Sequence, residues 1–517
     1  MKHTVKRLAR MLLAISMILT LIPAVPAYAD EPADGSDIIK VPTPHKYGLH
    51  VDENGTILLE GKPFYGFGIN YFGAFAHYED GSLSLEAVDA AFESIASHNI
   101  PLVRLPLDGY YANYYDRWDD EAQRAAILTK MHEVMDIAEK YHVGVVVSLM
   151  WWDPAMPEHL GAKRADMGDK NSAYVAYAKN YVSAVVSEFV NHPAVWGWEI
   201  GNEYNLDADL CDANYKDFLW ADGLPGSKPT ERNGYDYFTT EELKVFYAEI
   251  SRTIRSIDDY RLITTGESSM RNCAFSLHKA SRRPSSKHTW VLNWTPDNRS
   301  GFQKILEAHN GGDIDTISFH VQFGTGGSDP SYVLEFDVFN EKLSAVEYIR
   351  AYVDAARTLK KALFFGEFGD FIGMESAEDM PETFDKLCGW VEEAGVQVAC
   401  LWQYQDYADV GTGALKYDIL AERNRALIDA GKQDTSAAWL TYVVDPSMET
   451  ESPTSPDSEA PSESVTETAS DSGTTSESVA ETASAETGCT SALAAAPLTA
   501  VATASACALC KKRKKAN

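Results

Sequence analysis

The sequence predicts an α/β protein folded as a (β/α)8 (TIM) barrel with long loop insertions. Between about residues 45 and 446, short runs of β-branched or aromatic residues are followed by longer stretches whose apolar residues recur every three or four positions. Strands that alternate with helices indicate parallel βαβ units, and the chain holds eight such repeats. A doubly wound open sheet is the alternative. It favours a Gly-rich phosphate turn after the first strand, and "GFGINYFG" (66–73) lacks the GxGxxG spacing.

The eight predicted strands are short and rich in β-branched and aromatic residues. They cover residues 64–70, 101–107, 143–151, 194–203, 261–267, 315–323, 362–369 and 398–404. The helices predicted between them include 84–99, 124–142 and 347–362.

Two further features complete the predicted barrel. Residues 50–64 predict a small hairpin that turns at Asn54–Gly55, and we expect it to cover one end of the barrel. Insertions at about 205–240 and 267–312 follow the fourth and fifth strands. Loops in these positions lie at the active face of such a barrel.

Both ends of the chain carry predicted targeting segments. Residues 1–29 join a basic stretch, an apolar stretch and "AYA", which predicts a secretory signal peptide cleaved after Ala29. A membrane anchor is the alternative, but the apolar run is short and is broken by Pro23 and Pro26. The barrel domain is then expected over 30–446.

Residues 447–488 are dominated by Ser, Thr, Glu, Ala and Pro, without Lys or Arg. Such a segment buries too little apolar area to offset its ordering entropy, so we predict a disordered, extended linker. Residues 489–517 follow, with a weakly apolar run of spanning length and then the basic "KKRKKAN".

The junction between linker and apolar run reads "SAETG" (484–488). It resembles the sorting signal of Gram-positive wall-anchored proteins, which is Leu-Pro-any-Thr-Gly before an apolar span and a basic tail. Thr487 and Gly488 match this pattern, whereas Ser484 and Ala485 depart from it. We therefore expect a protein held at the outer surface of a Gram-positive cell, by the cell wall or by a simple membrane anchor.

Charge and cysteine content exclude other classes of protein. The formal net charge of −31 would repel phosphates, so nucleic acid is not an expected partner. The seven cysteines are scattered and form neither a disulfide scaffold nor a zinc site, although one disulfide is left open. No pair of histidines has metal-ligand spacing, so no metal is expected. The expected buried thiols are Cys211, Cys273, Cys388 and Cys400.

Polar side chains at the strand ends predict the site. They are Arg104 on the second strand, Asn202 and Glu203 at the end of the fourth, His320 on the sixth, Glu367 on the seventh and Trp402 on the eighth. The carboxyl ends of barrel strands hold the active site. Two carboxylates across one barrel mouth, with an Arg and a His between them, suit glycoside hydrolysis, which needs one acid and one carboxylate that attacks or activates water.

Other interpretations of these residues remain open at this point. Arg104 could form a structural ion pair with Asp108 or Asp153, and His320 and Trp402 could belong to the core. Asp153, just past the third strand, is a candidate for binding a sugar hydroxyl. Aromatic faces suit the apolar face of a pyranose ring. The further stacking candidates are Trp151, Trp152, Trp294 and Tyr71.

With "WEIGNE" (198–203) and "FFGEFG" (364–369), residues 45–445 resemble a glycoside hydrolase of clan A, most like family 5, the cellulase and mannanase family. The resemblance implies a retaining double displacement on β-linked sugars. It implies that Glu203 is the acid/base, Glu367 the nucleophile, and Asn202 the partner of the sugar 2-hydroxyl. It also implies that Arg104 steadies the nucleophile, that His320 is the strand-six His, and that Trp402 is the floor under the reacting sugar.

Two departures leave the subfamily and the substrate open. The family usually carries His-any-Tyr on strand six, whereas this chain has His320, Val321 and Gln322. Strand three often ends in a His, and here it ends in "LMWWD" (149–153).

The two carboxyl groups need opposite protonation. An acid/base at Glu203 requires a raised pKa, which we expect Trp196, Trp198 and the charge of Glu367 to supply. Glu367 must stay ionised, with Arg104 as its partner. Once a sugar esterifies Glu367, its charge disappears and the pKa of Glu203 should fall, so that Glu203 can act as the base.

Together these features predict a secreted, monomeric, retaining β-glycosidase acting on β-1,4-glucan or β-mannan without a cofactor. A non-catalytic sugar-binding barrel is one alternative, although both carboxylates are present. An enzyme of the same clan with another linkage, such as a galactanase or an exo-acting β-glycosidase, is the other.

Overall fold

The computed structural model describes residues 38–210, 237–280, 293–323, 336–370, 380–404, 412–445 and 447–448. The chain divides into two compact units, and residues 46–439 hold the described part of the larger one, here called the barrel unit. The predicted signal peptide, the linker beyond residue 448 and the apolar tail lie outside the described residues. No helix in the described part has the length and apolar content to cross a bilayer.

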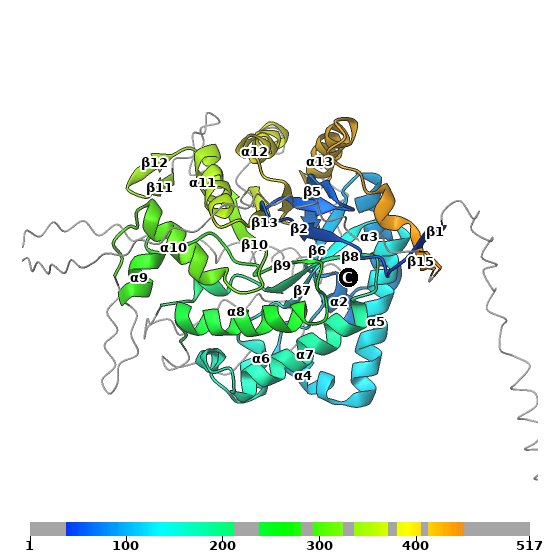
Figure 1. Cartoon of the computed structure of the whole chain (residues 1–517), viewed down its shortest axis with the longest axis horizontal. Helices are drawn as coiled ribbons and strands as arrows, with labels where there is room; N and C mark the ends of the chain where they lie inside the picture. Colours follow the sequence, from blue (N-terminus) through cyan, green and yellow to red (C-terminus); the bar gives the residue numbers. More distant parts are fainter. Residues whose placement is uncertain are drawn as a thin grey trace, which may run out of the picture. The chain divides into compact units, whose positions relative to one another are not determined.

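Eight parallel strands form the sheet at the centre of the barrel unit (Figure 1). They are β5 (Gly66–Asn70), β6 (Leu102–Pro106), β7 (Gly144–Met150), β8 (Val195–Gly201), β9 (Leu262–Thr264), β10 (Thr316–Phe323), β13 (Ala362–Asp370) and β14 (Val398–Leu401). The order is β10-β13-β14-β5-β6-β7-β8-β9, and the terminal strands β9 and β10 contact each other. The predicted (β/α)8 barrel is therefore confirmed, with one strand in each predicted run.

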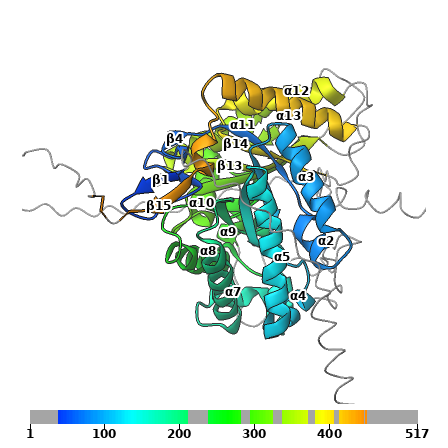
Figure 2. The same ribbon diagram turned by 90° about the vertical axis from the view of Figure 1, so that its right-hand side faces the viewer.

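Helices lie around this sheet, and Figure 2 shows α11, α12 and α13 on one side of it and α5, α7 and α8 on another. The helices are α2 (Ala74–Glu79), α3 (Leu85–Ser97), α4 (Ala112–Asp119), α5 (Glu121–Lys140), α6 (Ala155–His159), α7 (Ala173–Phe189), α8 (Thr240–Arg255), α9 (Ala274–Ala280), α10 (Arg299–His309), α11 (Ala345–Thr358), α12 (Met380–Ala394) and α13 (Thr412–Asp429). Short 3-10 turns cover Arg164–Gly168, Tyr204–Leu206 and Ser436–Trp439.

Capping residues set the helix starts that apolar periodicity placed too late. The predicted helix 124–142 begins at residue 121, because the side chain of Asp120 accepts the N–H of Gln123. The predicted helix 347–362 begins at 345, because Ser344 and Glu347 form a reciprocal capping box.

The predicted hairpin is present and has a short third strand. β2 (Leu49–Val51), β3 (Ile57–Leu59) and β4 (Lys62–Pro63) form an antiparallel sheet. Its turn uses Gly55, whose φ is +78°. A second hairpin joins β11 (Phe336–Val338) to β12 (Glu341–Leu343). In the smaller unit, β1 (Ile38–Val41) pairs in parallel with β15 (Thr441–Val444).

The first hairpin closes the amino end of the barrel, as the sequence predicts. Its apolar residues join a buried cluster with side chains from the first part of several barrel strands, here called the lower core. The lower core includes Leu49, Ile57, Leu59, Phe64, Leu102, Val146, Trp196, Leu262, Phe364 and Val398. Because this end is filled with apolar side chains, the carboxyl ends of the strands are left for polar groups.

The described cysteines also agree with expectation. Cys273, Cys388 and Cys400 are buried free thiols, and Cys211 lies outside the described residues.

Gly144→Ala tests the packing of the lower core. A Cβ on Gly144 would lie inside the van der Waals surface of the fully buried Trp196 ring. We expect the variant to lose about 1–3 kcal/mol of unfolding free energy, as overpacked cores do, measured by urea denaturation. Gly389→Ala is the control, because the nearest atom to its added Cβ lies 3.8 Å away and α12 gains a better helix former. Equal stability of Gly144→Ala and wild type would contradict this packing.

Candidate active site

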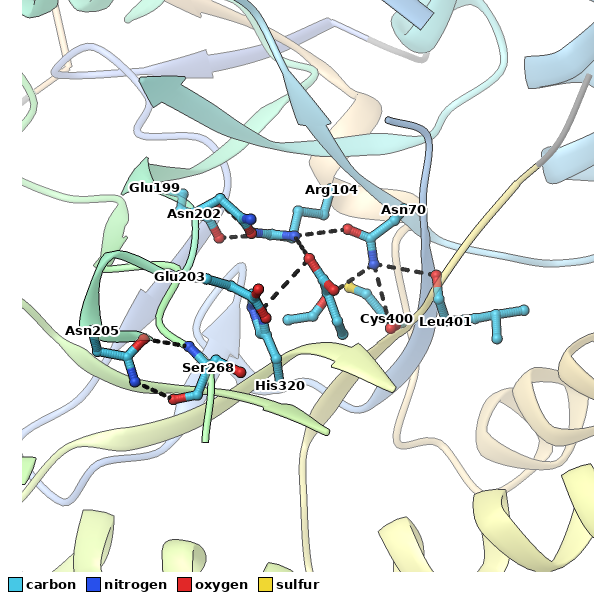
Figure 3. Close-up of polar contacts among 12 residues, drawn as sticks. Asn70, Arg104, Glu199, Asn202, Glu203, Asn205, Ser268, His320, Cys400 and Leu401 are labelled. Atoms are coloured by element: carbon cyan, nitrogen blue, oxygen red, sulfur yellow. Dashed lines mark hydrogen bonds and ion pairs between the residues drawn. The ribbon is translucent and has the colours of Figure 1, made fainter. Parts of the chain in front are cut away.

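Arg104 lies at the centre of the candidate site, and every N–H of its fully buried guanidinium has a partner (Figure 3). Nε and Nη2 donate to the two carboxylate oxygens of Glu199, each at 2.7 Å. Nη2 also donates to Asn202 Oδ1 at 2.8 Å. Nη1 donates to Glu367 Oε1 at 2.8 Å and to Asn70 Oδ1 at 3.0 Å. The alternative pairing of Arg104 with Asp108 or Asp153 is therefore wrong.

Strand alternation places Arg104 in the barrel interior. On β6, Leu102 joins the lower core, whereas Val103 and Leu105 pack in the cluster toward the helices. Arg104 follows Leu102 by two residues, so it points inward one layer higher. On β8 the register against β7 shifts between Val195 and Gly197, so Trp196 lies in the lower core although Trp198 and Ile200 lie in the outer cluster.

Glu367 reaches the interior through an irregularity in β13. Phe365 packs outward, so strict alternation would point Glu367 outward as well. The register against β10 shifts so that Phe319 pairs with Phe365 and His320 pairs with Glu367, which leaves Gly366 as an extra residue. A Cβ on Gly366 would lie 2.5 Å from His320 Nε2, so the ring also requires glycine there.

Glu203 ends β8 by a change of backbone conformation. Its φ and ψ of 56° and 28° are left-handed, and its N–H donates to Gly266 O at 2.8 Å. This turn directs its carboxylate toward His320 and Ser268, which both hydrogen-bond it. Asn205 in turn holds the backbone of Ser268 through two reciprocal bonds of 3.0 and 2.8 Å. A carboxylate and an amide can therefore follow a buried strand because the strand ends at them.

His320 brings the two predicted catalytic carboxylates together. Its Nδ1 lies 3.2 Å from Glu203 Oε1 and 3.5 Å from Glu367 Oε1. The Glu203 and Glu367 carboxylates offer oxygens within 4.8 Å of each other. Three groups that could ligate a metal thus lie close together. The side chain of Gln322, on strand six, is not among those that the structure describes.

The pKa directions in this pair depend on the charge of His320. Burial raises the pKa of Glu203, but the hydrogen bond and charge of His320, with Ser268 and Arg104, outweigh it and lower the pKa below 4.5. Burial raises the pKa of Glu367 above 4.5, and the charge of Glu203 adds to this while His320 and Arg104 oppose it. With a charged His320, the order is therefore the reverse of the one predicted from sequence.

The two tryptophans expected to raise the pKa of Glu203 do not surround it, and that prediction is wrong. Trp196 lies in the lower core, where its ring meets Phe64 edge-on. Trp198 points outward and donates its Nε1–H to Asp258 at 2.8 Å. Strict alternation would point both rings to one face of the strand, but the register shift beside Trp196 places it in the lower core while Trp198 faces outward.

The unpartnered nitrogen of His320 favours a neutral ring. Nε2 is buried and has no hydrogen-bond partner within the described residues. A proton there would leave a buried donor unsatisfied, at a cost of about 1–3 kcal/mol. The neutral tautomer with its proton on Nδ1 avoids this cost and still donates to the carboxylates. In that state the charge of His320 no longer lowers the pKa of Glu203, whereas its hydrogen bond still lowers it and burial still raises it.

Six aromatic residues line the neighbouring part of the barrel mouth. They are Phe72, Tyr110, Tyr111, Trp151, Trp152 and Trp402. The guanidinium of Arg104 lies 4.6 Å from the Trp151 ring centroid, and Trp151 and Trp402 stack at 6.2 Å. Trp402 and Trp152 are partly exposed, as a sugar platform requires, whereas Trp151 is buried.

Two other stacking candidates behave differently. Tyr71 is only 1% exposed and packs on Phe92 and Tyr404, so it is a core residue and its prediction as a sugar contact is wrong. Trp294 is 55% exposed, in the chain between α9 and α10.

Asp153 forms an ion pair with a neighbouring loop. Its carboxylate accepts from Arg164 Nη1 at 2.6 Å, and the same nitrogen donates to Asp207 at 2.6 Å. Asp153 thus ties the segment after β7 to the segment after β8, and its contact with a sugar stays a prediction.

Sequence reasoning missed four residues of the site: Asn70, Glu199, Asn205 and Ser268. Glu199 stood in the quoted motif, and a carboxylate within an apolar strand signals a buried partner. Asn70, the last residue of β5, had the same signal as Asn202, because both are amides at the end of a barrel strand.

The family model of cellulase (glycosyl hydrolase family 5) matches residues 59–407, a range that contains all eight barrel strands and every group named above. The chain belongs to glycosyl hydrolase family 5. The predicted family is thereby confirmed, and the carboxylate pair lies at the barrel end where this fold places its chemistry.

Two curated proteins are similar to parts of this family 5 chain, and both are named mannan endo-1,4-beta-mannosidase A. It is 23% identical to mannan endo-1,4-beta-mannosidase A of Aspergillus aculeatus, over 50% of this chain and 62% of the relative. It is 27% identical to the Emericella nidulans protein of the same name, over 22% of this chain and 35% of the relative. The chain therefore spans less than two thirds of the length of either relative.

Solved structures with a similar backbone fold include an endo-1,4-beta-mannanase from Rhizomucor miehei. It is 17% identical, with a TM-score of 0.48 over 73% of this chain and 99% of that one. An exo-beta-1,4-mannosidase from Opitutaceae bacterium strain TAV5 is 14% identical, with a TM-score of 0.49 over 74% of this chain and 63% of that one.

A second buried acid–base network begins at Glu267, the residue after Gly266, whose carbonyl accepts the N–H of Glu203. Glu267 Oε1 is 2.6 Å from His309 Nδ1, and His309 Nε2 is 2.9 Å from Thr240 Oγ1. Thr240 gives its hydroxyl proton to Asp209, so its oxygen must accept from His309. Both ring nitrogens therefore carry protons. Burial alone would lower the pKa of His309, but the charge and hydrogen bond of Glu267 raise it above 6.5.

His309→Gln should therefore destabilise the protein in a pH-dependent way. A raised folded-state pKa gives stability that is fully present below the unfolded pKa of 6.5 and is lost as pH rises through the folded pKa. We expect a loss of about 3–5 kcal/mol near pH 5.5, as for other broken buried pairs, and a smaller loss at alkaline pH, by urea unfolding.

His132→Gln is the matched control, because the His132–Glu188 pair has a similar 2.7 Å contact but is exposed. It should change stability by less than about 1 kcal/mol at either pH. A loss in His309→Gln that did not vary with pH would refute the charged state of His309.

Proposed function

We propose that this protein is a retaining β-glycosidase that hydrolyses β-1,4-linked mannan, with β-1,4-glucan as the second substrate. The observation that carries the proposal is the pair of carboxylates, Glu203 and Glu367, that meet at His320 while Arg104 holds one of them. Oxygens within 4.8 Å of each other support direct attack, since retaining sites separate their carboxyl groups by about 5–5.5 Å. The names of the two curated relatives support mannan as the first substrate.

In the first step, Glu367 attacks the anomeric carbon. Arg104 Nη1 and His320 Nδ1 both face Oε1, so Oε2 is the oxygen that forms the new bond. As the glycosidic C–O bond breaks, the proton of Glu203 moves to the leaving oxygen. Water then attacks the same carbon, Glu203 takes its proton, and the ester bond to Glu367 breaks.

The orientation of Asn202 fits the sugar contact that the family resemblance implies. Arg104 Nη2 donates to Asn202 Oδ1, so the amide must present its NH2 group elsewhere. An NH2 directed into the pocket can donate to the sugar 2-hydroxyl. Trp402, partly exposed in the aromatic cluster, supports the ring face.

The neutral state of His320 assigns the proton to the acid/base. Arg104 contacts Glu367 directly and remains charged, so it favours the ionised nucleophile. Without an imidazolium beside it, burial favours the protonated form of Glu203 against the hydrogen bonds of His320 and Ser268. Loss of the Glu367 charge on esterification then lowers the pKa of Glu203 for the second step.

Variants of the two carboxylates test the roles. Glu367→Ala should abolish turnover on every substrate, and azide should restore activity with a product of inverted anomeric configuration. Glu203→Ala should lose about 10²–10⁴-fold on polysaccharide but keep activity on aryl glycosides with good leaving groups, which need no proton. Exposed Glu93→Ala is the control. Wild-type rates in both site variants would reject the assignment.

A substrate panel and the stereochemistry of the product test the rest of the proposal. We expect the purified barrel to release product from β-1,4-mannan faster than from β-1,4-glucan, xylan or galactan. NMR of the first anomer released should show retention. Binding without hydrolysis would indicate a non-catalytic sugar-binding barrel, and activity on galactan alone would indicate the other linkage.

We also propose that the enzyme acts outside the cell as a monomer attached to a Gram-positive wall. The support is the order of signal-peptide-like start, linker, "SAETG", apolar run and basic tail in the sequence. Thr487→Ala should move the protein from the wall fraction to the membrane or the medium. Native protein that retains its C-terminal lysines and is extracted by detergent alone would leave only a membrane tail.

A further inference from the structure

Glu199 is a second carboxylate beneath the reacting pair that the mechanism above does not use. It lies on β8 with no exposure, and so does Arg104 on β6. Both of its oxygens accept from the Nε and Nη2 edge of the guanidinium. Figure 3 shows Glu199 and Asn202 on one side of Arg104 and Asn70 on the other.

The two contacts of Arg104 with carboxylates differ in kind. Glu199 makes the two-bond fork that is the strongest form of this ion pair, whereas Glu367 receives one bond, from Nη1. Burial lowers the pKa of Arg104, and the charge of Glu199, ahead of that of Glu367, raises it. Glu199 is therefore the principal counter-ion of Arg104.

We infer that Glu199 is a positioning residue that neutralises Arg104 and fixes its rotation, so that the nucleophile Glu367 receives a hydrogen bond without a full counter-ion. This inference rests on the proposed function of Glu367. The fork leaves only Nη1 free to face Glu367 and Asn70, so the direction of that bond is set by Glu199. The balanced charge keeps electron density on the attacking oxygen.

Loss of the Glu199 charge should affect the two chemical steps in opposite directions. With the full charge of Arg104 directed at Glu367, the carboxylate becomes a weaker nucleophile, and formation of the glycosyl ester slows. The same carboxylate becomes a better leaving group, and hydrolysis of the ester accelerates. kcat/KM, which reports the first step, should fall more than kcat on substrates for which the second step is rate-limiting.

The decisive variants are Glu199→Gln and Glu199→Asp. Gln removes the charge, so the acid limb of the kcat/KM profile on an aryl β-mannoside should move to lower pH by about one to three units. Asp keeps the charge but shortens the side chain, so the limb should stay in place while kcat/KM falls. A merely structural carboxylate would lower activity in both variants without moving the limb.

Asp258→Asn is the matched control, because Asp258 forms an equally buried pair with Arg261 outside the site. It should leave the limb of the profile unchanged. Near-UV circular dichroism checks the fold of each variant. If Glu199→Gln does not fold, Glu199→Ser removes the same charge with a smaller side chain: an unmoved limb overturns the inference, and a limb moved to lower pH supports it.

A titration that needs no turnover separates this inference from the proposed function. Carbon-13 NMR of carboxyl-labelled glutamate, with Glu367 assigned by the signal lost in Glu367→Gln, follows the nucleophile directly. The titration of Glu367 should move to lower pH in Glu199→Gln and should not move in Asp258→Asn. An unmoved titration overturns the inference even in an active enzyme. A moved titration in a protein that hydrolyses no glycan supports it and rejects the proposed function.

Discussion

A guanidinium removed from water is tolerated only when its charge is balanced and all of its donors are bonded, because burial of an ion costs several kcal/mol otherwise. Arg104, on β6, meets this condition with groups from β5, β8 and β13 and with Asn202, which follows β8. The barrel must close for these strands to bring their groups to one point. Closure of the fold and assembly of the site are therefore one event, and loss of any partner leaves a buried polar group unpaired.

The division of the barrel into two layers makes this polar centre possible. The hairpin and the lower core, with Trp196 among its largest side chains, fill the amino end with apolar groups. Water is thereby kept from the underside of Arg104 and Glu199, where electrostatic interactions are stronger than in solvent. The carboxyl end keeps Glu203, Asn202 and Trp402 partly exposed, which is where a polymer chain has to enter.

The proton arrangement follows from contacts that are individually ordinary. His320 lies between the two glutamates, and its second nitrogen packs on Gly366 without a partner in the described structure. A neutral imidazole leaves Arg104 as the nearby cation, and Arg104 contacts only one of the two carboxylates. The nucleophile and the acid thus differ in their distance from one guanidinium. The positive charge of that guanidinium is balanced by Glu199.

The sequence alone determined the strands, the closing hairpin and the family, because periodicity, turn residues and short motifs are local signals. It also placed both carboxylates, Arg104, Asn202, His320 and Trp402 at strand ends. Only the tertiary structure decided that Glu199 pairs with Arg104, 95 positions away, and that Trp196 and Trp198 face away from Glu203. It also decided that the irregularity at Gly366 turns Glu367 inward. Partners separated by this much chain are chosen by barrel closure and register, and a side chain's direction reverses with one extra residue, so neither can be obtained from local pattern.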